Sequence, residues 1–290
     1  MEIFTDSTDK TITSSDLIAF AEDSGLKDVH LIEASLFVDV PADAKSILIG
    51  FMPYTWNKKA SLGRMPLSGY YPVSNKGHDI IRSIGRFLVS AGVYSEPNRT
   101  VPEKLIASHC GGTFGLNSLY YHPEYGSAVF IATLFTGVEP EKGFRPKKAE
   151  LNPLCSNCGK CRKSCPVQAL DDKDIKEVCL RAHMFKKPLS AEYARHIYQL
   201  MGCEVCQTVC PLNSSVPFDS DHSFDIMTLF KDRSELAQMI GRNYARKTIV
   251  LQQVIAYAAN TGFKGCIDEV EALKYDPMLK PVCDYYLSLV

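Results

Sequence analysis

The sequence has almost no net charge and no long apolar run. Its formal net charge is −1 over 290 residues, so there is no electrostatic reason to expect non-specific binding to nucleic acids or to membranes. No run of about 18 apolar residues occurs, so no membrane-spanning helix is expected. The amino terminus lacks a basic segment followed by an apolar one, and it lacks a twin-arginine pair, so no export signal is expected. These absences predict a cytoplasmic protein.

Cysteine, by contrast, is abundant and concentrated in one segment. Eleven cysteines occur, and eight of them lie between residues 154 and 211. The first run, residues 155–166, reads C-x2-C-x2-C-x3-C-P, which is the pattern of half of a bacterial ferredoxin. The second run, residues 203–211, reads C-x2-C-x3-C-P and is one cysteine short. Cys179, between the two runs, is the available replacement.

This spacing predicts two 4Fe-4S clusters. Three thiolates so close in sequence can bind three irons of one cubane, whereas the fourth, next to a proline that starts a helix, points toward the other cluster. The expected ligands of the first cluster are Cys155, Cys158, Cys161 and Cys210. Those of the second are Cys165, Cys179, Cys203 and Cys206.

Zinc and disulfide bonds are the alternatives for so many cysteines. Zinc sites usually pair two C-x2-C motifs and need neither a third cysteine at the same spacing nor the Cys-Pro ending. A disulfide framework is typical of short secreted chains, whereas this chain is long and shows no signal peptide. The spacing therefore favours the clusters, which a reducing cytoplasm would preserve.

The first 150 residues read as mixed α and β structure. Ser14-Ser15-Asp16 is expected to cap a helix that ends near Gly25. Residues 29–40 and 46–51 are rich in β-branched side chains and predict strands, as does 127–135. Residues 79–91 predict an amphipathic helix. A charged, proline-containing stretch, 139–150, predicts a linker into the cysteine-rich segment.

A glycine-rich segment precedes the last of these strands. It reads Cys110-Gly-Gly-Thr-Phe-Gly-Leu-Asn117. Its glycines let the backbone bend sharply or lie close against a flat ligand. Taken alone, the segment favours an ordinary turn over a ligand site.

The sequence beyond Pro211 predicts helices. Residues 224–240, 242–260, 269–275 and 280–287 carry apolar side chains at helical spacing. The break at Asn260-Thr-Gly262 is typical of a terminal α-solenoid repeat. Two further cysteines fall on the apolar faces of these helices and are expected to be core thiols: Cys266 and Cys283.

These motifs together resemble the epoxyqueuosine reductase family, cobalamin- and iron–sulfur-dependent enzymes of tRNA modification that are related to reductive dehalogenases. Residues 46–54 resemble an early strand of that family ending in Pro-Tyr. The glycine-rich segment followed by His122-Pro-Glu-Tyr-Gly-Ser127 resembles its corresponding segment and strand entry. The cluster cysteines and residues 201–213 match its ligand motifs residue by residue. The chain is identified as a short and divergent member.

The resemblance implies an α+β protein of three domains. Residues 1–150 would form a mixed α/β domain of the cobalamin-binding type, residues 151–215 a ferredoxin-like two-cluster domain, and residues 216–290 a short HEAT-like helical region. Electrons would pass from a reduced donor of the ferredoxin or flavodoxin type through the two clusters to cobalt. The substrate would be a small molecule or would be carried on tRNA.

The resemblance also implies the site residues. Those expected to contact cobalamin are Gly111, Gly112, Gly115, Asn117, Tyr125, Gly126 and Ser127. The candidates for catalysis are Tyr71, Glu96, Arg99 and Cys110. Cys110 also fits a small buried residue, and Tyr71 a packed tyrosine with a hydrogen-bonded hydroxyl.

One departure from the family concerns its proton donor. The family has an acidic Asp-Ser/Thr-Ala-Pro stretch, in which the aspartate is the expected donor. This chain has Pro97-Asn98-Arg99-Thr100 there, and proline cannot act as a general acid. Glu96, one position away, is a substitute with the wrong neighbours. Two functions therefore stay open: a reductase of this type with a different substrate, and a non-catalytic protein that carries electrons to a partner.

Overall fold

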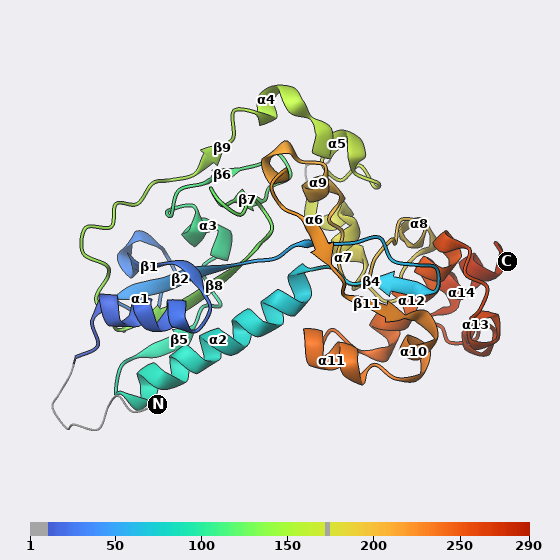
Figure 1. Ribbon diagram of the computed structural model, residues 1–290, viewed down its shortest axis with the longest axis horizontal. Coiled ribbons are helices and arrows are strands. Elements are labelled where there is room, and N and C mark those ends of the chain that lie inside the picture. The colour runs from blue at the N-terminus through green and yellow to red at the C-terminus, as the bar shows by residue number, and fades with distance from the viewer. Residues whose placement is uncertain (1–10, 172–174) are drawn as a thin grey trace. The chain divides into compact units, whose positions relative to one another are not determined.

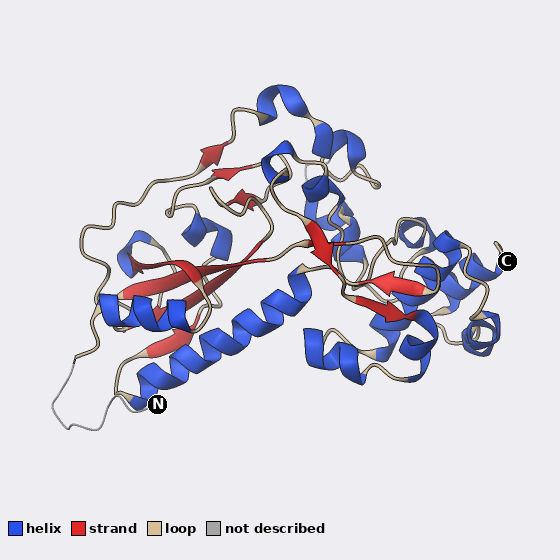
Figure 2. Cartoon of the chain, in the orientation of Figure 1, coloured by secondary structure: helices blue, strands red, loops and turns tan. Residues whose placement is uncertain are grey.

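The computed structural model describes residues 11–171 and 175–290 and divides into two compact units. Unit 1 combines Met1–Met52, Gly77–Cys110 and Ile131–Lys148. Unit 2 combines Pro53–Lys76, Gly111–Phe130 and Ala149–Val290. Figure 1 labels the helices and strands, and Figure 2 shows that the chain contains both types. The predicted mixed α+β class is thus confirmed.

Unit 1 is built on a four-stranded sheet of order β1-β2-β8-β5. Its strands are β1 (Lys27–Glu33), β2 (Ser46–Pro53), β8 (Val129–Thr136) and β5 (Ser95–Pro97). β1 runs antiparallel to β2, and β5 antiparallel to β8. All positions of β2 except its last are buried, as expected for an inner strand covered on both faces. The first predicted strand is shorter than expected, because a 3-10 turn, η1 (Ala34–Leu36), follows Glu33.

The helices of unit 1 differ from the predictions at their starts. α1 (Ser14–Asp23) packs beside β1 and is capped by Thr13, one residue earlier than predicted, with Asp16 completing a capping box. α2 (Tyr70–Ser90) begins nine residues before the predicted helix, in the part of the chain that belongs to unit 2. Proline is tolerated in its first turn, where no intrahelical N–H bond is lost. α3 (Glu103–Ala107) is short.

In its described residues, unit 2 contains three small sheets. The glycine-rich segment forms the hairpin of β6 (Thr113–Phe114) and β7 (Tyr120–Tyr121), with β9 (Glu150–Leu151) parallel to β6. The other two sheets join the segment 53–76 to residues that follow the cysteines. They pair β3 (Trp56–Asn57) with β10 (Phe218–Ser220), and β4 (Arg64–Pro66) with β11 (Ser223–Asp225).

The cysteine-rich segment consists of short helices joined by turns. They are α4 (Cys155–Cys158), α5 (Lys160–Ser164), α6 (Ile175–Val178), α7 (Leu180–His183), α8 (Ala191–Ala194), α9 (Val205–Thr208) and the 3-10 turn η2 (Pro211–Asn213). α4 and α5 bury none of their residues, whereas the stretch from Leu180 to Met201 contributes to the hydrophobic core. Core packing therefore holds the second half of this segment but not α4 and α5.

The carboxy-terminal helices complete the core of unit 2. They are α10 (Ile226–Lys231), α11 (Ser234–Ile240), α12 (Lys247–Thr261), α13 (Ile267–Leu273) and α14 (Lys280–Leu287). The helix predicted over 224–240 is in fact two. α12 is buried from Ile249 to Ala259, because α8, α10 and α14 pack against it. Cys266 and Cys283 are fully buried, as predicted. Among the described residues, none of the helices has the length and apolar character needed to span a bilayer.

Candidate metal centre

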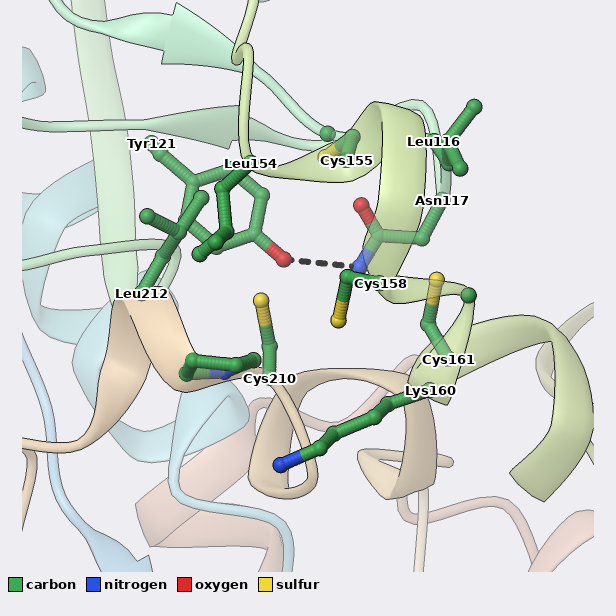
Figure 3. Close-up of a pocket in the computed structure, with 13 residues that line it drawn as sticks. Leu116, Asn117, Tyr121, Leu154, Cys155, Cys158, Lys160, Cys161, Cys210 and Leu212 are labelled. Carbon is green, nitrogen blue, oxygen red and sulfur yellow. Dashed lines mark hydrogen bonds between the residues drawn. The ribbon is translucent and has the colours of Figure 1, made fainter.

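Four cysteines from two distant parts of the sequence surround one pocket of unit 2. Cys155 and Cys158 come from α4, Cys161 from α5, and Cys210 from the residue before η2. The space between these side chains that no atom fills is about 330 Å³, a volume that includes open solvent. Figure 3 shows the four side chains around it, with Tyr121 and Asn117 lying among them. These are the four cysteines that the sequence assigns to the first cluster.

The local backbone explains how three of these thiols reach one pocket. Gly159, between α4 and α5, has a φ of 62°. This left-handed conformation costs glycine little and lets the chain turn sharply between the two helices. Leu116, Leu154 and Leu212 provide apolar walls beside the sulfurs.

For Cys161 and Cys203, the neighbouring thiols that raise the pKa belong to the same set that the sequence assigns. Burial raises the pKa of Cys161, and the nearby thiols of Cys210 and Cys155 add to this rise. Burial likewise raises the pKa of Cys203 to about 11, with contributions from Cys179 and Cys165.

Cys206 lies where the two sets meet. Its pKa is raised to about 12, first by burial and then by Cys203, Cys179 and Cys161. Metal binding requires deprotonated thiolates, so iron uptake by these cysteines would release protons.

The donor set suits iron–sulfur clusters. Within 11–171 and 175–290, no three or more His, Cys, Asp or Glu side chains gather closely enough to hold a single metal ion. In a 4Fe-4S cluster each cysteine binds a different iron, so the ligands surround a space instead of converging on one atom. The first set has that arrangement, and its donors are all soft thiols, which suit such clusters.

The glycines of the hairpin make room for the protein's own side chains. A Cβ atom on Gly115 would lie 2.6 Å from the side-chain oxygen of Asn117 and 2.6 Å from the Tyr121 ring. One on Gly112 would collide with the backbone of Tyr121. Gly111 has a φ of 89° and no described atom within 4 Å of the position that a Cβ would occupy. The position beside Gly111 is therefore open, whereas the positions beside the other two are occupied by the protein's own atoms.

Asn117 and Tyr121 form a buried pair at the pocket. Asn117 Nδ2 donates a hydrogen bond of 2.9 Å to the Tyr121 hydroxyl. Burial raises the pKa of Tyr121, so its hydroxyl stays protonated. Asn117 was expected to contact cobalamin, and the structure places it among the cluster cysteines. Tyr121 was not predicted, because nothing in its sequence context signals that it reaches the cysteines.

Ser127 and Gly126, which were also expected to contact cobalamin, contact residues in or just after the second cysteine run. The backbone N–H of Ser127 donates to Asn213 Oδ1 (2.9 Å), and Asn213 Nδ2 donates to Ser127 Oγ (2.8 Å). Ser127 Oγ in turn donates to Gln207 Oε1 (3.1 Å). Gly126 packs directly on Asn213, and Tyr125 stacks on His122. Asn213 and Gln207 belong to the matched motif 201–213, but their structural role was not predicted.

Tyr71 lies in the core of unit 2. Its ring centre is 5.1 Å from that of Tyr244, and the guanidinium of Arg181 is 5.9 Å from it. Burial raises the pKa of Tyr71 to about 12, while the charge of Arg181 opposes the rise. The hydroxyl is therefore protonated at neutral pH and retains a proton that it could donate.

The other three catalytic candidates lie in unit 1. Glu96 is exposed on β5 and accepts a hydrogen bond of 2.8 Å from the Tyr94 hydroxyl. Arg99 is exposed in the loop that follows. Cys110 is half-buried, and burial raises its pKa to about 12, so it carries a thiol and not a nucleophilic thiolate at neutral pH.

Residues 97–100, which were expected to differ from the family's acidic stretch, form an ordered turn. Asn98 Nδ2 donates to the carbonyl of Val101 (2.7 Å) and to Thr133 Oγ1 (3.0 Å). Its Oδ1 accepts from the backbone N–H groups of Thr100 and Val101. Asn98 thus fixes the loop between β5 and α3.

A second, more open pocket of unit 2 lies beside the second cysteine set. Its lining includes Tyr198, Glu204 and Val205, which lie next to Cys203 in sequence or space, and Lys58 and Asn260. The Tyr198 hydroxyl accepts a hydrogen bond of 2.6 Å from the backbone N–H of Glu204.

Comparison with known proteins defines the class of this site. Residues 154–213 match the family model of a 4Fe-4S double cluster binding domain. The protein is thus an iron–sulfur protein with a double-cluster domain within a mixed α+β fold.

Relatives of known name narrow this class. Over 118 residues, 39% of the chain, it is 33% identical to an epoxyqueuosine reductase of Listeria monocytogenes and covers 30% of that protein. Its fold matches a solved epoxyqueuosine reductase from Streptococcus thermophilus with a TM-score of 0.72 and 18% identity, over 95% of this chain and 89% of the other. It also matches an epoxyqueuosine reductase solved with an epoxyqueuosine-modified tRNA-Tyr stem loop (TM-score 0.72, 19% identity, 94% and 88% covered).

The predicted resemblance to the epoxyqueuosine reductases is confirmed in sequence and in fold. The sequence matches are partial: the chain spans between 30% and 58% of the curated relatives' lengths. At these identities the structural matches establish the fold.

Proposed function

We propose that the protein is an iron–sulfur and cobalamin-dependent reductase of the epoxyqueuosine reductase type. The observation that carries this proposal is the pocket that brings Cys210 to the three cysteines of 155–161 and sets the glycine-rich hairpin against them. A cluster there would adjoin the segment in which the family resemblance expects cobalamin. Its oxygen-sensitive clusters suit the reducing cytoplasm.

The eight cysteines are proposed to hold two 4Fe-4S clusters in the two sets given above. The pocket geometry supports the first set, and the mutual influence of Cys203, Cys179 and Cys165 supports the second. A reduced donor of the ferredoxin or flavodoxin type would supply electrons, one at a time, to this pair.

Cobalamin is proposed on the resemblance and on the open space beside Gly111. When bound, it supplies a strongly reducing cobalt centre, while the protein contributes binding, orientation and exclusion of water. Tyr71 holds its proton at neutral pH, and Glu96 is exposed to solvent. These two side chains are the available proton donors in this proposal.

The substrate is proposed to differ from epoxyqueuosine. One solved relative holds an epoxyqueuosine-modified tRNA stem loop, so a tRNA-borne or small-molecule substrate is in keeping with the fold. However, Pro97 stands where the family has its acid, and loss of a positioned general acid typically costs about 100- to 10,000-fold in rate. Arg99 nearby carries a fixed positive charge that suits an anionic group on the substrate.

The alternative is a protein that only carries electrons. The occupied space beside Gly112 and Gly115 favours it, because the protein's own side chains fill two of the three positions at which a corrin would lie close to the backbone. Such a protein would deliver electrons from its clusters to a partner.

Anaerobic turnover of epoxyqueuosine with a strong reductant tests the proposal. We expect little or no turnover by the unmodified chain and a gain of about 100-fold or more on Pro97→Asp. Glu96→Gln, made in parallel, shows whether Glu96 supplies any residual activity. Rapid turnover by the unmodified chain would contradict the proposed change of substrate.

A further inference from the structure

The buried pair Asn117–Tyr121 occupies the wall of the cysteine pocket. Asn117 is 6% exposed and Tyr121 is 3% exposed, and both line the pocket with the four cysteines. They come from the hairpin and not from the cysteine motifs. Because both residues are distant in sequence from the cysteines, their burial among the expected cluster ligands calls for an explanation.

The pair reaches one cysteine in each set. The Tyr121 hydroxyl accepts from Asn117, and Figure 3 shows this hydroxyl and the sulfur of Cys210 close together and facing one another; the Cys210 side chain contributes to the raised pKa of Tyr121. Asn117 Nδ2 also donates to the carbonyl of Cys206 (3.4 Å), and its amide lies within hydrogen-bonding reach of the Cys206 thiol. Cys210 belongs to the first set and Cys206 to the second.

Packing fixes the pair in this position. The absent side chain of Gly115 leaves the space that the Asn117 amide and the Tyr121 ring share. Asn117 Oδ1 accepts from the backbone N–H of Leu119 (3.4 Å), which orients the amide so that its N–H groups face the cysteines. Little rotation is left to either side chain.

We propose that Asn117 and Tyr121 are positioning residues that set the reduction potentials of the two clusters through hydrogen bonds to their ligands. This inference rests on the proposed cluster assignment. Reduction adds negative charge to a cluster and its thiolates, so a donor to sulfur stabilises the reduced state more than the oxidised state and raises the potential. Tyr121 acts on the first cluster, and Asn117 acts on the second directly and on the first through Tyr121.

The test is an anaerobic redox titration of the reconstituted full chain followed by EPR. Tyr121→Phe should lower the midpoint potential of one cluster and leave the other unchanged, and Asn117→Ala should lower both. Tyr120→Phe is the matched control: Tyr120 is equally buried on the same strand but lies outside the pocket lining of the described chain. Tyr198→Phe should lower the midpoint potential of the second cluster only, because a side-chain hydrogen bond with Tyr198 lowers the pKa of Cys203.

A spectroscopic measurement on the unmodified chain supports the titration. Exchange into D₂O should remove a proton coupling of the reduced first cluster in pulsed EPR, and Tyr121→Phe should lack that coupling from the outset. Because it uses the unmodified chain, the D₂O measurement still tests the inference when a variant does not assemble its clusters well.

The inference would be overturned if Tyr121→Phe had the same cluster potentials and proton couplings as the Tyr120→Phe control. A chain that takes up zinc, or about four irons, would instead contradict the cluster assignment on which it rests.

Discussion

Gln253 accepts a hydrogen bond of 2.8 Å from the backbone N–H of Met201, two residues before Cys203. Gln253 is a fully buried side chain of α12. Its neighbour Gln252 donates to the carbonyls of Met184 and Lys186, both at 2.9 Å. The chain that leads into the second cysteine run is therefore fastened to a core helix without any metal.

Removal of the clusters should loosen only part of the cysteine-rich segment. From sequence alone, 154–211 is expected to melt as a whole on iron chelation, because it has few large apolar side chains. The structure restricts this expectation: α4 and α5 bury nothing, whereas 180–201 packs into the core. Hydrogen exchange after chelation should rise strongly over 155–165 and little over 180–201. Equally fast exchange in both would show that the core packing does not hold the second half.

Gln253→Leu should destabilise unit 2. It leaves the buried N–H of Met201 without its acceptor, which costs about 1–3 kcal/mol in the free energy of unfolding. Gln238→Leu is the control, because that side chain is exposed on α11 and such surface changes usually stay within about 0.5 kcal/mol. Denaturant unfolding of the anaerobically reconstituted chain measures both. Equal effects of the two substitutions would argue against the role assigned to Gln253.

Single cysteine replacements should separate the two clusters. The unmodified chain is expected to hold about eight irons and eight sulfides. Cys158→Ser should damage only the first cluster, and Cys179→Ser only the second, so each leaves about four irons. Iron and sulfide analysis with EPR of the reduced protein checks this. Loss of the same signal in both variants would contradict the assignment of Cys179.

The cysteine motifs carry most of what the sequence could predict about the site. The fixed spacing of 155–166 forces its thiols together locally, and the pairing of Cys210 with them follows from the ferredoxin pattern. Tyr121, Gln207 and Asn213 could not be predicted in these roles, since they meet the cysteines through tertiary packing alone. The helix break at Asp232-Arg233 and the burial of α12 on every side are likewise set by neighbouring helices and not by local propensity.

The contribution of His30 to the stability of unit 1 should be lost as the pH rises above about 6.5. A hydrogen bond to Asp28 raises the pKa of His30, burial opposes this, and Glu141 adds to the rise. A raised folded-state pKa means that protonated His30 stabilises the fold; this contribution is complete below the unfolded-state value of about 6.5 and is lost as the pH passes the higher folded value. His30→Gln should flatten this part of the pH profile of thermal unfolding. An unchanged slope in His30→Gln would show that His30 does not cause this pH dependence.

Stoichiometric cobalamin binding tests the central claim most directly. The full chain, reconstituted anaerobically with iron and sulfide, is titrated with cobalamin and followed by absorbance. The account predicts that a chain with both clusters binds cobalamin one to one, with a saturable change in the absorbance of the corrin. A chain that holds both clusters but binds no cobalamin would contradict it and leave the protein as an electron carrier.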